Sequence, residues 1–180
     1  WRFITPIFIH IGFLHLALNS MALYYLGSSV ERIYGSVRFL AIYLFAGFAG
    51  VVARFVLNTT LSAGASGAIF GCLGALLYFG ISNKKLFFRT MGMNIILLLI
   101  VNLALGFIMP GIDNAGHIGG LLGGFLAAAA VGMPKRSKWY YQIAKVLVLI
   151  AGSIALILFG FNKQTDVNYD VTLSSLAQEY

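Results

Sequence analysis

Residues 64–81 read GASGAIFGCLGALLYFGI and contain no charged side chain. At a rise of about 1.5 Å per residue, a helix of this length crosses most of the roughly 30 Å hydrocarbon core of a bilayer. Gly67, Gly71 and Gly74 recur every three or four residues, so they lie on one side of that helix. We therefore expect a membrane helix with a smooth face against which a second helix packs closely.

The composition of the whole chain also indicates a lipid environment. Of its 180 residues, 60% are hydrophobic and only 9% are charged, whereas soluble domains carry about 25% charged residues. This excludes a disordered chain, and it excludes a nucleic-acid-binding module despite the net charge of +7. A disulfide-linked secreted domain is excluded too, because Cys72 has no second cysteine to pair with.

Six apolar stretches have about the length of a membrane-spanning helix. Because unpaired backbone groups are costly in lipid, each stretch is expected to be helical. The predicted fold class is therefore an all-α polytopic membrane protein, a helical bundle. The six stretches cover residues 7–26, 39–57, 65–81, 91–109, 115–131 and 143–161.

Basic residues gather at one set of helix ends, which the positive-inside tendency places in the cytoplasm. Only Arg2, Arg54 and Lys163 fall at the opposite ends. We therefore expect the first residues, the loops near 58–64 and 110–114, and the tail to face outward from the cell membrane. The residues at the cytoplasmic ends are Arg32, Arg38, Lys84, Lys85, Arg89, Lys135, Arg136, Lys138 and Lys145.

The two ends of the chain carry further expectations. The chain starts at Trp1 without a signal peptide, although its first residues are expected outside. We therefore expect an earlier span to precede it. Residues 162–180 are polar and expected outside, and residues 173–180 could begin a further helix.

Polar side chains inside membrane spans are costly, so they mark candidate functional positions. His15 and Asn19 are four residues apart and share one helix face, while Ser66 and His117 stand near the start of their spans. All four lie toward the outer side at a comparable depth. The other polar residues of the spans are His10, Asn94, Asn102 and Asn114.

The four residues at one depth fit the chemistry of a serine nucleophile. Gly116, Gly120 and Gly124 form a second smooth face, so the spans 65–81 and 115–131 should touch. Contact would bring the His117 imidazole within hydrogen-bond reach of the Ser66 hydroxyl. The free N–H groups at a helix start, with donors from the first span, favour a developing oxyanion. Those donors are His15 and Asn19.

At these positions the sequence resembles the rhomboid family of intramembrane serine proteases. The resemblance implies a six-helix core whose first helix is missing here, a dyad of Ser66 and His117 without aspartate, and hydrolysis of peptide bonds in or beside substrate transmembrane helices. It spans residues 1 to about 131. The matching residues are Trp1, Arg2, His10, His15, Asn19, Glu31, Arg32, Gly35, Gly64, Ala65, Ser66, Gly67, Asn114, His117, Gly120 and Gly124.

The resemblance also implies a division of the chain and some supporting roles. Residues 1–133 are expected to form the protease core, 134–161 a cytoplasmic loop and an additional helix, and 162–180 a tail leading to a repeat domain, similar to Gram-positive members. The helix 91–109 and the loop 110–114 correspond to elements associated with substrate entry and capping. Phe70 replaces a tyrosine common in the family. The expected supporting residues are His10, Phe70, Asn114, Gly64 and Gly67.

Structural roles for the same residues stay open beside the catalytic ones. Ser66 is also a suitable helix N-cap, or could bond back to a carbonyl one turn earlier. His117, His15 and Asn19 could link neighbouring helices through hydrogen bonds. His10 is as well suited to anchoring a loop as to catalysis. It is five residues from His15, and on a helix this spacing would place the two on different faces.

Rival functions remain at this point. The alternative to an endopeptidase is a catalytically silent rhomboid-like binder of transmembrane helices; a small transporter or channel is a third class. A metal-dependent protease is disfavoured because Glu occurs only at Glu31 and Glu179, and a two-aspartate protease because no span contains Asp. Asp113 is assigned to a loop and Cys72 to the core. The expected partners are transmembrane substrates and the bilayer, with no cofactor, metal or nucleic acid and no oligomeric state assigned.

Overall fold

A computed structural model describes residues 1–57, 64–109, 111–134 and 138–178, with side chains up to residue 164. Within these ranges the chain is helical and contains no β-strand. The elements are the 3₁₀ helix η1 (Thr5–Phe8), α1 (Phe13–Ala22), the π-helical turn η2 (Leu23–Gly27), α2 (Ser28–Tyr34), α3 (Ser36–Leu57), α4 (Ser66–Ser82), α5 (Lys84–Thr90), α6 (Gly92–Ile108), α7 (Asn114–Val131) and α8 (Trp139–Gln178).

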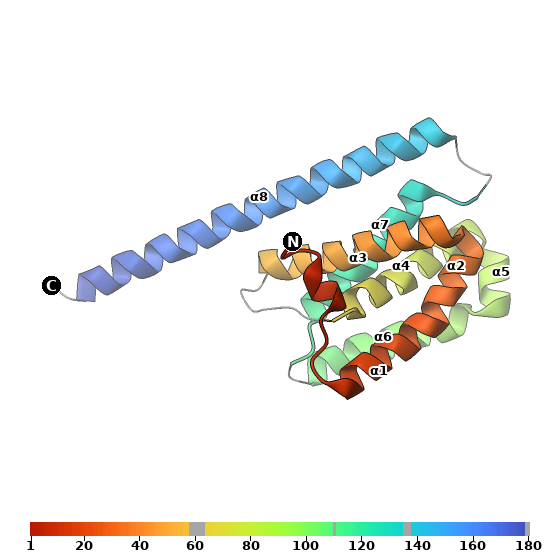
Figure 1. Cartoon of the computed structure of the whole chain (residues 1–180), viewed down its shortest axis with the longest axis horizontal. Helices are drawn as coiled ribbons and strands as arrows, with labels where there is room; N and C mark the ends of the chain where they lie inside the picture. Colours follow the sequence, from red (N-terminus) through yellow and green to blue (C-terminus); the bar gives the residue numbers. More distant parts are fainter. Residues whose placement is uncertain (58–63, 110, 135–137, 179–180) are drawn as a thin grey trace.

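Helix α4 lies at the centre of the bundle. It packs against α3 and α7 over most of its length, and against α1, α2 and α6 at its other sides. Figure 1 shows the elements arranged around α4, with α8 along one side and α1 on the opposite side. A helix enclosed on all sides needs no polar face, which agrees with the apolar sequence of 64–81.

Glycines bring α4 and α7 into backbone contact. A Cβ added to Gly67 would lie 3.3 Å from the carbonyl oxygen of Gly116, and one added to Gly120 would meet the carbonyl of Gly67. One turn further, a Cβ on Gly124 would meet the backbone of Gly71. The predicted contact between the spans 65–81 and 115–131 is therefore confirmed. Any larger side chain on this seam forces the two helices apart.

The helices support a membrane bundle. However, fewer than the predicted six are long and apolar enough to span a membrane. Among the described residues, three helical stretches are long and apolar enough to span: Ser36–Leu57, Asn114–Val131 and Trp139–Gln164. The pair α5 and α6, bent by 74°, gives up to a fourth. The central helix α4 is apolar but has only 17 residues.

One predicted boundary was wrong, and one helix extends beyond the apolar stretch that predicted it. Residues 7–12 do not belong to the first long helix, which begins at Phe13 after Gly12 adopts a φ of 82°. Ile7 instead lies in η1 and is buried against Gly47 of α3, so its hydrophobicity serves the core rather than a span. At the other end, α8 continues through residues 162–178 without a break. Neither Gly nor Pro follows Gly160, so no residue there ends the helix.

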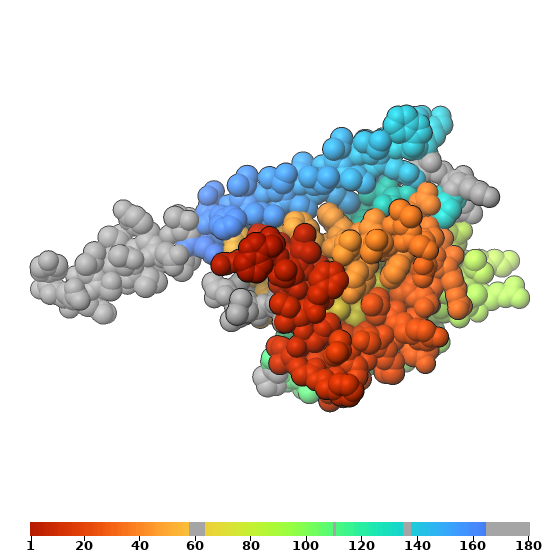
Figure 2. Space-filling view, in the orientation of Figure 1, coloured from red at the N-terminus to blue at the C-terminus, as the bar shows by residue number. Residues whose placement is uncertain are grey.

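Helix α8 lies on the outside of α3 and α7, and most of its side chains are exposed. Figure 2 shows it lying along one side of the bundle up to residue 164. Lysines on α8 bond to both helices: Lys145 Nζ donates to the Ala129 carbonyl at 3.2 Å, and Lys163 Nζ to the Val56 carbonyl at 3.1 Å. Both carbonyls lie in the last turn of a helix, where a cation is favourable.

Candidate active site

Ser66 is the first residue of α4 and is half-buried. Its N-cap, Ala65, provides no side-chain hydrogen bond to the helix. In the described part of the chain, the first N–H groups of α4 therefore lack the side-chain acceptor that usually satisfies them. The start of α4 thus combines a hydroxyl with backbone donors at the positive end of a helix dipole.

His117 lies at the same level as Ser66, in the first turn of α7. The two residues are neighbours of Gly67 and Gly116, whose backbones meet. The imidazole stacks on Phe70, with ring centroids 4.1 Å apart and an angle of 8° between the planes. No hydrogen bond joins Ser66 to His117 among the described residues, and His117 Nδ1 has no partner there. Phe70 therefore fixes the ring plane of the imidazole.

Asp113 bonds to the backbone of α7 and to an arginine of α3. Its Oδ1 accepts the Gly116 N–H at 2.8 Å, which makes it the N-cap of α7. The same carboxylate forms an ion pair with Arg54 of α3 at 2.6 Å. Sequence reasoning missed this pair, although an arginine near the end of an apolar stretch signals a buried acidic partner. Asp113 thus holds the start of α7 in place.

His15 lies against the residues that lead into Ser66. A Cβ on Gly64 would lie 2.8 Å from His15 Cε1 and 2.9 Å from Nε2. Gly64 also has a φ of 124°, a conformation that favours glycine. The Ile11 N–H donates to His15 Nδ1 at 3.3 Å, so the neutral imidazole carries its proton on Nε2. The nitrogen nearest Gly64 is therefore a hydrogen-bond donor.

Asn19 and His10 are the other two polar side chains that lie near His15 in the N-terminal region. Asn19 is only 8% exposed, and its Nδ2 donates to the His15 carbonyl at 2.9 Å, which leaves one amide hydrogen for another acceptor. The ring of His10 lies 5.4 Å from that of His15, edge to face. The prediction that His10 occupies another helix face was wrong, because residue 10 precedes the helix. Its buried Nε2 has no partner among the described residues.

The other polar candidates form no hydrogen bond with Ser66 among the described residues. The Asn114 side chain packs against Gly106 of α6, with its Oδ1 buried and unpartnered in the described part of the chain. Asn102 Nδ2 bonds back to the Leu98 carbonyl at 2.8 Å, and Asn94 is exposed. Cys72 is fully buried, in agreement with its assignment to the core. Pro110 of the predicted capping loop lies outside the described residues.

Together, the fold and the polar group define a class of protein: a multi-pass, all-helical membrane protein with serine, histidine and asparagine gathered at one end of a glycine-packed helix pair. The family model described as Rhomboid domain matches residues 1–134. The chain belongs to the rhomboid family.

Several curated proteins resemble this chain. It is 54% identical over 162 residues to rhomboid protease GluP of Bacillus subtilis (strain 168), a match that covers 90% of this chain and 32% of that protein. It is 34% identical to RHOMBOID-like protein 4 of Arabidopsis thaliana over 188 residues, a match that covers 90% of this chain and 46% of that protein. It is 39% identical to Arabidopsis RHOMBOID-like protein 5 over 130 residues, 69% of this chain and 42% of that protein. The chain therefore spans less than half the length of these relatives.

Proposed function

We propose that the chain carries the catalytic core of an intramembrane serine endopeptidase. The observation that carries the proposal is the meeting of α4 and α7 at Gly67 and Gly116, which places Ser66 and His117 at one level. The family membership and the similarity to a named rhomboid protease support it. The two residues then form the nucleophile and base of a dyad.

In the proposed reaction, Ser66 Oγ attacks the carbonyl carbon of a peptide bond while the His117 imidazole accepts the hydroxyl proton. The imidazolium gives that proton to the leaving amine, which breaks the C–N bond and leaves an acyl-enzyme. A water molecule, deprotonated by the same imidazole, then attacks the ester, and the proton returns to Ser66 Oγ. Phe70 stacking keeps the imidazole in one plane through these steps.

The oxyanion is stabilised by three donors in this proposal. They are the Ser66 N–H at the start of α4, His15 Nε2 beside Gly64, and the second Nδ2 hydrogen of Asn19. Each donor of this kind contributes about 2.7–4 kcal/mol to transition-state stabilisation. His10, packed edge to face on His15, helps to hold that ring. Asp113 is not part of the dyad, because it binds Arg54 and caps α7.

The substrates in this proposal are transmembrane segments of other membrane proteins. Their peptide bonds are shielded while helical, so a segment must unwind locally to reach Ser66. We place its entrance between α1 and α6: both pack on α4, and they do not pack extensively on each other in the described part of the bundle. Many apolar side chains of α6, such as Leu97 and Ile100, are exposed.

The proposed placement in the cell membrane keeps six crossings, with α1, η2 and α2 as one crossing and the short α4 enclosed by the others. The Ser66 end faces the extracytoplasmic side, because most basic residues lie at the opposite end. Arg54 fits this placement since its charge is balanced by Asp113. No metal or cofactor takes part in the proposed reaction.

The experiment is labelling of the purified protein in detergent with a serine-reactive fluorophosphonate. Wild-type protein is expected to label, while Ser66→Ala and His117→Ala are expected to lose the label. Ser153→Ala is the matched control, because among the described residues Ser153 Oγ bonds only back to the Leu149 carbonyl of α8. A folded wild-type protein that stays unlabelled beside a reactive serine hydrolase would overturn the proposal and favour a silent binder of transmembrane helices.

A further inference from the structure

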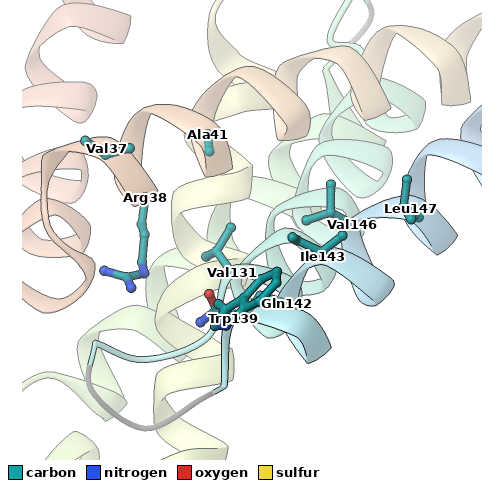
Figure 3. A pocket seen from close by; sticks show the side chains of 9 residues that line it. All are labelled: Val37, Arg38, Ala41, Val131, Trp139, Gln142, Ile143, Val146 and Leu147. Carbon is teal, nitrogen blue, oxygen red and sulfur yellow. The ribbon is translucent and has the colours of Figure 1, made fainter.

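At the end of the bundle opposite Ser66, a pocket of about 490 Å³ lies between α3, α7 and α8. It is lined by side chains from residues 37–41 of α3 and 139–147 of α8, and by Val131, the last residue of α7. Figure 3 shows the lining side chains, with those of α8 turned toward α3 and α7. The pocket lies on the outside of the bundle, because α8 is its outermost helix.

Polar and apolar groups are separated along this pocket. Arg38, Trp139 and Gln142 lie near the starts of α3 and α8, and Figure 3 shows the Arg38 guanidinium on the side toward Trp139. Ala41 and Leu147 lie further along the same helices. Leu147 is eight residues beyond Trp139 on α8, which is about 12 Å along the helix axis. The pocket thus has a cationic mouth and a long apolar interior.

The charge of Arg38 has no anionic partner in the described part of the chain. Arg38 is half-buried, and it forms no ion pair there. The whole sequence has only five acidic residues: Glu31, Asp113, Asp166, Asp170 and Glu179. Asp113 is bound to Arg54 at the other end of the bundle. We therefore expect the anionic partner of Arg38 to belong to a bound molecule. The guanidinium of Arg38 matches the geometry of a phosphate group, which favours a phosphate as that anion.

Aromatic residues place the mouth of the pocket at a membrane surface. Trp139, Tyr140 and Tyr141 open α8, and tryptophan and tyrosine are enriched where a bilayer meets water. Lys138 precedes these aromatic residues, and its Nζ lies 5.8 Å from the centre of the Tyr140 ring. Basic pockets between membrane helices at this level bind anionic lipid headgroups.

We propose that this pocket binds one anionic phospholipid. Its phosphate pairs with Arg38 at the mouth, and one acyl chain lies along Ala41, Ile143 and Leu147 between the helices. A free phosphate ion fits less well because it would leave the apolar interior empty. The smaller pocket of about 300 Å³ on the other face of α8 fits a lipid headgroup less well, since neither an arginine nor an aromatic side chain lines it and its lysine, Lys145, is held at the Ala129 carbonyl.

Native mass spectrometry of the full chain in detergent tests the proposal. Phosphatidylglycerol and phosphatidylcholine with identical acyl chains are added separately, and the fraction of protein that retains one lipid is measured. Wild-type protein is expected to retain phosphatidylglycerol at concentrations where little phosphatidylcholine binds. Arg38→Gln is expected to weaken phosphatidylglycerol binding about fivefold, as expected for one basic residue at a membrane surface.

Three further variants separate the pocket from general effects. Ala41→Phe, which fills the interior without changing charge, is expected to lose the lipid, whereas Arg38→Lys keeps most of it. Arg89→Gln removes an exposed cation of α5 and should not change binding. Equal losses in Arg38→Gln and Arg89→Gln, no effect of Ala41→Phe, or equal binding of the two lipids would each overturn the proposal. An unchanged melting temperature shows that each variant is folded.

Discussion

The ring of Phe70 stacks on the imidazole of His117, with centroids 4.1 Å apart and planes within 8° of parallel. Phe70 is one turn after Ser66 and is almost fully buried, so the stack joins the two helices of the proposed dyad. The family resemblance places a tyrosine at this position in many members. The geometry indicates that the aromatic face, rather than a hydroxyl, orients the imidazole.

Phe70→Tyr is therefore expected to keep the fluorophosphonate labelling rate within about threefold of wild type, because the ring remains. Phe70→Leu keeps the position apolar but removes the stack. A loss of roughly 0.5–1.5 kcal/mol from this aromatic pair slows labelling by up to about tenfold. Rates are compared by gel fluorescence over time. Equal rates for Phe70→Leu and wild type would contradict this role.

His15→Ala is expected to slow labelling about a hundredfold, because the proposed oxyanion loses one preorganised donor. The protein should stay folded, since the imidazole is only partly buried. Asn102→Ala is the matched control: this amide bonds only back to Leu98 of its own helix among the described residues. A similar effect of both changes would assign His15 to general packing instead.

Gly124→Ala is expected to destabilise the protein by about 1–3 kcal/mol, because the new methyl group would overlap the Gly71 backbone. Gly152→Ala on α8 is the control, since nothing lies within 4 Å of the added atom. There the better helix propensity of alanine adds up to about 1 kcal/mol. Thermal unfolding in detergent measures both. Equal melting temperatures would show that α4 and α7 do not depend on this contact.

Asp113→Asn is expected to keep labelling within about tenfold of wild type. The amide oxygen can still cap α7, while the ion pair with Arg54 is lost. If Asp113 oriented the imidazole as the third member of a triad, the same change would reduce the rate about ten-thousandfold. Labelling kinetics distinguish the two cases directly, and Arg54→Gln should reproduce the small effect.

The features that the sequence predicted well are local or periodic. Hydropathy located α3, α4, α6 and α7 to within three residues at each end, but it did not predict the short α5. Glycine spacing predicted the contact of α4 with α7. The start of the first helix was predicted too early. The apolar Ile7 was counted in the membrane span, whereas it is buried in the core before the helix begins. The Arg54–Asp113 ion pair was missed because its partners are far apart in the chain and meet only after α3 packs beside α7.

The continuation of α8 shows another limit of sequence patterns. The polarity of the residues after 161 predicts a tail, since polar stretches usually mark a loop outside the membrane. The structure continues the helix to residue 178, and neither glycine nor proline interrupts it over residues 161–178. Polarity thus located the end of the apolar segment, but not the end of the helix.

The two lysines of α8 define how this helix is aligned with the bundle. Apolar side chains packed in lipid tolerate sliding, since one methyl group replaces another at little cost. The hydrogen bonds from Lys145 to Ala129 and from Lys163 to Val56 do not tolerate such sliding, because each needs a particular carbonyl oxygen. They lie about 27 Å apart along the helix. The pair therefore sets the vertical register of α8, so that α8 and the bundle meet a change in bilayer thickness as one body.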